Sequence, residues 1–226
     1  MVRRFATGAV LVAVGLVLAA CGGVGPATGA PDAKAATGPA PDELMREGPL
    51  GDRVLGNAKA PVTVIEYASL TCPHCANFQR NVFPRVKKEF IETGKVRFIV
   101  REFPIGHTSG TAAIVNRCAP ADKYFELFNA FLLRQPEWVS LEIRPDAIYS
   151  VAKSSGMSRE TFDKCLTNQS IIDALTEVKQ RGRQFGVKGT PTFFINGQLA
   201  AQGEVTFEQI KAMIEPQSPP KPASGA

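Results

Sequence analysis

Two cysteines separated by two residues form the part of the chain best suited to chemistry. The run Cys72-Pro73-His74-Cys75 follows Val62–Tyr67, whose β-branched and apolar residues predict a buried strand. Because proline is favoured in the first turn of a helix, we expect a helix to begin at Cys72 or Pro73. Cysteines at positions i and i+3 then share one face of that turn, where their sulfur atoms can form a disulfide.

The expected position of Cys72 favours an anionic sulfur. Unpaired N–H groups and the helix dipole stabilise negative charge at a helix N-terminus, which lowers the pKa of a thiol there. His74 can add a positive charge or a donor, and Pro73 fixes the geometry of the helix entry. A stabilised thiolate is a good leaving group and stabilises the reduced form, so the Cys72–Cys75 disulfide is expected to be oxidising.

Two other interpretations of the cysteine pair remain open. The pair could be half of a zinc site, but zinc needs a second pair of ligands. The remaining candidates are Cys118 and Cys165, which are far apart in sequence, and His107, the only other histidine. The pair could also be an inert structural disulfide. The sequence favours redox chemistry over both, and we expect no metal and no cofactor.

The surrounding pattern predicts the elements that position this pair. A second strand is expected over Lys95–Phe103, and the residues from about 107 to 185 are expected to be helical. Strands at Thr192–Ile195 and Gln198–Ala201 then flank Asn196-Gly197, a strong hairpin signal, and a last helix follows Thr206. This order predicts an α/β domain with an inserted all-helical block.

The N-terminus predicts export. A short basic start is followed by an uncharged apolar run, so residues 1–21 are typical of a signal peptide. Leu18-Ala19-Ala20-Cys21 resembles a bacterial lipoprotein cleavage box, which implies lipid attachment at Cys21. Ordinary signal cleavage is the alternative. We expect residues 22–44 to form a disordered tether, 45–215 the folded domain and 216–226 a disordered tail.

Composition limits the remaining function classes. Charged residues make up 21% of the 226 residues, as in ordinary globular proteins, and the net charge of +5 falls to +3 when residues 1–21 are removed. This excess is not clustered, so binding to nucleic acid is not expected. Four cysteines remain without Cys21. An even number in an exported chain suggests disulfides, and four cysteines allow three pairings.

Two motifs resemble a known family. The run from Glu66 to Cys75 is similar to the active-site region of DsbA-like thiol–disulfide oxidoreductases, and Gly189–Gly197 is similar to their second signature. The runs Val54–Pro61 and Val96–Pro104 also match, so the resemblance covers about residues 50–215. It implies a thioredoxin fold with a helical insertion.

The resemblance assigns roles around the cysteine pair. It implies that Pro191 follows a cis peptide bond facing the disulfide, and that Thr190 offers backbone groups to a bound peptide. It also implies that Glu66 is a buried carboxylate that relays a proton to or from Cys75. A solvated or ion-paired glutamate is the alternative for Glu66.

The resemblance also bears on the other two cysteines. A subset of DsbA-like proteins carries a second, non-catalytic disulfide in the helical block, which implies a bond between Cys118 and Cys165. Two separate buried thiols are the alternative.

The function implied is oxidation of thiols in unfolded exported proteins. Cys72 is then the exposed nucleophile and Cys75 the buried resolving cysteine, a membrane partner reoxidises the pair, and the protein is a monomer outside the cytoplasm. One alternative is a reductase or isomerase, for which threonine at position 190 gives a reason. Another is a lipid-tethered chaperone that binds peptides without redox turnover.

Overall fold

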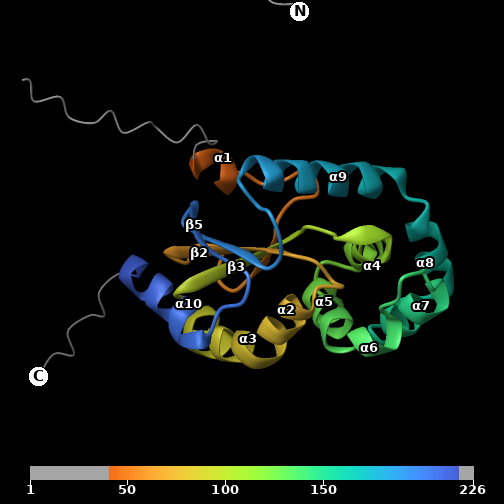
Figure 1. Cartoon of the computed structure of the whole chain (residues 1–226), viewed down its shortest axis with the longest axis horizontal. Coiled ribbons are helices and arrows are strands. Elements are labelled where there is room, and N and C mark those ends of the chain that lie inside the picture. Colours follow the sequence, from red (N-terminus) through yellow and green to blue (C-terminus); the bar gives the residue numbers. More distant parts are fainter. Residues whose placement is uncertain (1–40, 219–226) are drawn as a thin grey trace, which may run out of the picture. The chain divides into compact units, whose positions relative to one another are not determined.

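A five-stranded sheet forms the centre of the fold. The computed structural model describes residues 41–218; the expected signal peptide, Cys21, most of the expected tether and the end of the tail lie outside this range. The sheet has the order β1-β3-β2-β4-β5 (Figure 1). Its strands are β1 (Arg53–Leu55), β2 (Val62–Ala68), β3 (Val96–Glu102), β4 (Thr192–Ile195) and β5 (Gln198–Gln202).

Strand β2 is the central strand and leads to the cysteine pair. It pairs in parallel with β3 and antiparallel with β4, and every one of its residues is buried. Glu66 lies between Val100 of β3 and Phe193 of β4. An apolar, β-branched segment suits a strand buried on both faces, and this burial places a carboxylate in the middle of the sheet.

Helices cover both faces of the sheet. On one face lies a broken helix, made of α2 (Pro73–Asn77), η1 (Phe78–Val82), α3 (Phe83–Val86) and η2 (Lys87–Ile91), together with α10 (Phe207–Ile214). The segments η1 and η2 are wider π-helical turns on either side of α3, which contains Pro84, a residue without the backbone N–H that a regular helix uses. Figure 1 shows α9 and α1 on the opposite face.

The expected helical insertion is confirmed. It consists of α4 (Gly106–Cys118), α5 (Tyr124–Leu133), α6 (Gln135–Trp138), α7 (Pro145–Ser154), α8 (Arg159–Leu166) and α9 (Gln169–Gln184). A disulfide joins Cys118 at the end of α4 to Cys165 in α8, with 6.1 Å between their Cα atoms. In the chain-entropy model, closing a loop of this length stabilises the fold by about 4 kcal/mol.

The expected extent of the N-terminal tether is wrong at its end. Residues Pro41–Met45 form helix α1, and Leu44 is only 1% exposed. It packs in the apolar cluster between the sheet and α9, which also contains Tyr67 and Val178. The short helix escapes sequence analysis because it contributes one fully buried side chain, too few to produce a helical period.

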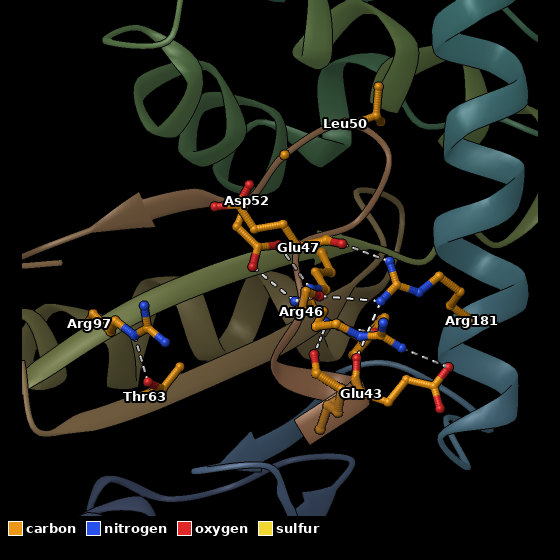
Figure 2. A network of polar contacts seen from close by, with 12 residues as sticks. Glu43, Arg46, Glu47, Leu50, Asp52, Thr63, Arg97 and Arg181 are labelled. Carbon is orange, nitrogen blue, oxygen red and sulfur yellow. Dashed lines mark hydrogen bonds and ion pairs between the residues drawn. The ribbon is translucent and has the colours of Figure 1, made fainter. Parts of the chain in front are cut away.

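Two arginines hold this N-terminal segment in place. Arg101 of β3, almost fully buried, donates to the carbonyl oxygen of Leu44 at 2.6 Å and pairs with Asp52 at 2.9 Å. Arg181 of α9 donates to the backbone oxygen of Glu47 at 3.0 Å (Figure 2). Such contacts satisfy carbonyl groups that a short helix leaves unpaired.

The C-terminal boundary differs slightly from the expected one, since a short 3₁₀ turn at Glu215–Gln217 continues past residue 215. Within residues 41–218, no helix combines the length and the apolar character needed to cross a bilayer.

Candidate active site

The cysteine pair lies at the start of α2, directly after the central strand. Cys72 is the N-cap residue and Pro73 the first helical residue, as expected, and both cysteines are free thiols in this structure. Cys72 is less exposed than expected. Its exposed fraction is only 9%, against 0% for Cys75. The loop before β4 lies against Cys72, whose thiol donates to the carbonyl oxygen of Thr190 at 3.1 Å.

The surroundings of Cys72 favour its thiolate. Its pKa falls from 9.0 to about 5, chiefly because the Cys75 thiol donates a hydrogen bond to the sulfur, while burial acts in the opposite direction. The backbone N–H groups of Cys75 and His74 also stabilise the anion. The buried hydroxyl of Thr190, which has no partner while the sulfur is protonated, favours the anion too. The N–H groups of His74 and Cys75 are unpaired donors of the helix N-terminus, whereas Thr190 lies on the loop before β4.

Cys75 behaves in the opposite way. Burial raises its pKa well above 9.0, and its hydrogen bond to Cys72 and the nearby Glu66 carboxylate raise it further. One sulfur is therefore held as an anion and the other as a thiol. This asymmetry identifies Cys72 as the sulfur that leaves and attacks easily, and Cys75 as the one that needs a proton when the disulfide breaks.

Glu66 lies beneath the pair and is completely buried. Neither of its carboxylate oxygens has a hydrogen-bond partner, and burial raises its pKa to about 8, with the charge of Cys72 as the second cause. The alternative of a solvated or ion-paired glutamate is therefore wrong. A carboxyl group that is protonated at neutral pH and close to Cys75 can give or take a proton there.

His74 is exposed and is held by a residue that the sequence analysis did not single out. Its Nδ1 lies 2.7 Å from an oxygen of Glu204, which also accepts from Asn77 at 3.2 Å. Glu204 follows β5, more than a hundred residues away in sequence, so no local pattern could indicate it. The hydrogen bond to Glu204 raises the pKa of His74, which favours a positive charge beside the thiolate.

Replacing Glu204 by glutamine is expected to lower the pKa of His74 towards 6.5, because the amide cannot stabilise the imidazolium as the carboxylate does. The ion pair is exposed, so the effect should decrease as salt is added. NMR titration of the His74 ring protons measures it, with His107 as the internal reference. An unchanged His74 titration in Glu204→Gln would contradict this role.

The peptide bond between Thr190 and Pro191 is cis, as expected. It immediately precedes β4, which pairs with the strand that leads to Cys72. Because the carbonyl of Thr190 already accepts from the Cys72 thiol, the loop lies directly against the reactive sulfur. The residues of the two sequence motifs therefore meet in space.

The helical insertion also contacts the active-site loop. The side-chain amide of Gln135 in α6 donates to the carbonyl oxygens of Leu70 and Cys72, at 2.7 and 3.0 Å. The hydroxyls of Ser69 and Ser109 in α4 lie 2.7 Å apart. Sequence analysis missed both contacts because a polar residue in a helix gives no sign of its distant partner.

The expected bond between Cys118 and Cys165 lies within the insertion, apart from the cysteine pair at α2. Cys21 lies outside the described residues. Among residues 41–218, no three His, Cys, Asp or Glu side chains gather where they could hold a metal ion.

The chain is similar to known proteins. A family model described as Thioredoxin matches residues 50–216. A putative protein-disulfide oxidoreductase of Rickettsia conorii is 37% identical over 168 residues, which are 73% of this chain and 59% of that protein. The chain thus spans about three-fifths of that relative's length. Disulfide bond formation protein D of Bacillus subtilis is 26% identical, over 73% of this chain and 76% of that protein.

Solved structures agree with these sequence matches. The crystal structure of Wolbachia pipientis alpha-DsbA1 superimposes with a TM-score of 0.73 and 29% identity, covering 79% of this chain and 96% of that one. Oxidised BdbD from Bacillus subtilis gives a TM-score of 0.67 at 25% identity, covering 74% and 92% of the two chains.

Proposed function

Because this chain belongs to the thioredoxin family, and within it to the DsbA-like disulfide oxidoreductases, we propose that it introduces disulfide bonds into other proteins. The observation that carries the proposal is the opposite ionisation of two adjacent thiols. A Cys72 pKa of about 5 stabilises the reduced form at neutral pH. A stabilised reduced form makes the disulfide a stronger oxidant.

The first step is attack by a substrate thiolate on the Cys72 sulfur of the oxidised protein. A substrate–Cys72 disulfide forms and the Cys72–Cys75 bond breaks, so that Cys75 leaves with the electron pair. Since burial disfavours the Cys75 anion, this sulfur takes up a proton, and Glu66 is the acid placed to supply it. The backbone N–H groups at the helix N-terminus stabilise the Cys72 anion.

The second step releases the product. Another thiolate of the substrate attacks the substrate sulfur of the mixed disulfide, and Cys72 leaves as a stabilised thiolate. The substrate has then lost two electrons and two protons, and the cysteine pair has gained two electrons. Thr190, on the loop against Cys72, presents backbone groups that can pair with the substrate chain.

The setting follows from the sequence. The proposed substrates are reduced, unfolded exported proteins, and a membrane redox partner returns the pair to the disulfide. We place the protein outside the cytoplasm as a monomer, tethered by a lipid on Cys21. The lipoprotein cleavage box supports the tether, and the bond between Cys118 and Cys165 suits an oxidising compartment.

The reduction potential of the Cys72–Cys75 pair, measured at equilibrium with glutathione, tests the direction of transfer. We expect a potential closer to about −120 mV, which is typical of a strong oxidant, than to about −270 mV, which is typical of a reductant. A value near the lower figure would assign the protein to the reductases. If the pair does not exchange with glutathione at all, the protein is a binding protein without redox turnover.

A further inference from the structure

A groove near the active site lies between two helices of the insertion, α4 and α9. It has a volume of about 530 Å³, within the range of ligand sites in proteins. Its apolar lining comes from Ile114, Ile143, Ile172 and Leu175. None of these residues takes part in the exchange of thiols and disulfides, so the groove is free for another role.

One wall of the groove is positively charged and has no acidic partner. Lys179 and Arg183 line it, and no Asp or Glu does so among the described residues. The ammonium group of Lys179 donates to the carbonyl oxygen of Pro104 at 2.5 Å, and Arg183 forms no ion pair within residues 41–218. Burial and the neighbouring Arg183 lower the pKa of Lys179, as expected for two cations that share a site.

Exposed apolar side chains gather beside this groove. Of the four large apolar side chains that are exposed in the described part of the chain, three are Ile105, Leu141 and Ile143. Ile105 directly precedes α4, and the other two lie in the loop after α6. The hydroxyl of Thr108 in α4 donates to the carbonyl oxygen of Ser140 in that loop at 3.1 Å, which connects the two segments. Clustered apolar exposure of this kind marks interaction sites on soluble proteins.

The groove is connected to the active site. The hydroxyl of Thr71, the residue before the nucleophile, donates to the carbonyl oxygen of Ile105 at 3.3 Å. Pro104 and Gly106, on either side of Ile105, line the groove. A chain attached to Cys72 can therefore pass Thr71 and Ile105 and enter the groove.

We propose that this groove binds a segment of the substrate chain that carries apolar side chains and a carboxylate, while the substrate's cysteine is joined to Cys72. The apolar floor takes the aliphatic groups, and Lys179 and Arg183 take the carboxylate. This inference rests on the proposed function, and it adds a preference for acidic over basic substrate segments.

Matched peptides test the preference. Each carries one cysteine and a Leu-Ile-Glu segment, separated by spacers of about two, four and six residues, since each extended residue spans about 3.3 Å. A second set has lysine in place of glutamate. The rate of reaction with the oxidised full chain is measured for both sets and for glutathione. We expect the best acidic peptide to react about five- to tenfold faster than its lysine counterpart, with the difference decreasing in salt.

Variants locate the binding surface. Arg183→Glu should remove or reverse the preference for glutamate, and Ile143→Ser should slow both peptide sets. The controls are Lys88→Glu, an exposed lysine on η2, and Leu199→Ser, the fourth exposed apolar residue, on β5; both should leave the rates unchanged. Equal rates for the two peptide sets would contradict binding in this groove. So would control variants that change the rates as much as the groove variants do. Loss of the reaction with glutathione would instead overturn the proposed redox function.

Discussion

Replacing Cys72 by serine is expected to reduce the rate of disulfide transfer to a reduced protein by about a thousandfold or more. Serine cannot form a disulfide, and its hydroxyl stays protonated under conditions in which the Cys72 thiol, with a pKa of about 5, is an anion. The measurement is the recovery of activity by a reduced, disulfide-dependent test protein in the presence of the oxidised enzyme.

Two further variants separate the role of Cys72 from a loss of folding. Cys75→Ser retains the nucleophile but cannot form the Cys72–Cys75 disulfide, so it should not oxidise a reduced substrate. When its Cys72 thiolate attacks a substrate that already contains a disulfide, the mixed disulfide should be long-lived, because the resolving thiol is missing. The double variant Cys118→Ala/Cys165→Ala removes the bond within the insertion, which lies outside the cysteine pair, and should retain transfer at temperatures where it is folded. Full activity in Cys72→Ser would rule out the assigned nucleophile.

Replacing Glu66 by glutamine is expected to stabilise the reduced protein increasingly as the pH rises. Glu66 has a pKa of about 8 when folded and 4.5 as its ordinary value, so the folded state binds more protons between these limits. The contribution of this group to the free energy of unfolding therefore decreases from about pH 4.5 to about pH 8. Glutamine does not titrate, so its contribution to the free energy of unfolding does not change with pH. We expect the difference between the two proteins to grow by about 4 kcal/mol over that range.

Urea unfolding of the reduced proteins at several pH values measures this difference. The comparison is needed because the lowered pKa of Cys72 stabilises the reduced protein in the opposite sense, with stability gained above about pH 5 in both proteins. Glu177→Gln, at an exposed position on α9, is the matched control. If the curves of Glu66→Gln and the unchanged protein stay parallel across pH, Glu66 is not the buried acid described here.

The same substitution should affect the exchange reaction. Without an acid beneath Cys75, the step in which this sulfur leaves should slow by about tenfold or more at neutral pH. A stable but slow Glu66→Gln variant would separate the proton relay from a purely structural role, because loss of structure would lower the stability as well.

The sequence was sufficient for the elements with strong local signals. The alternation and composition of Val62–Tyr67, the proline after Cys72 and the Asn196-Gly197 turn each predicted the observed element to within about two residues. The strand Arg53–Leu55 was not predicted, since three half-buried residues carry no period. Helix α1 was missed for the same reason.

The site was predictable in its cysteines and in the lowered pKa of Cys72, but not in the distant groups that act on the pair. Burial of Glu66 could not be derived from its position in the sequence, because a carboxylate in a strand is equally compatible with an ion pair. Glu204 and Gln135 reach the site from distant elements, and only the fold brings them there. The covering of Cys72 by Thr190 has the same origin, since the two residues are 118 positions apart.

The central claim is that Cys72 is an anion at neutral pH while Cys75 is not, and ultraviolet titration of the reduced protein tests it most directly. The thiolate absorbance should rise with a single midpoint near pH 5, corresponding to one sulfur, and this step should be absent in Cys72→Ser. A midpoint above about pH 8, or a step at pH 5 that persists without Cys72, would contradict the account.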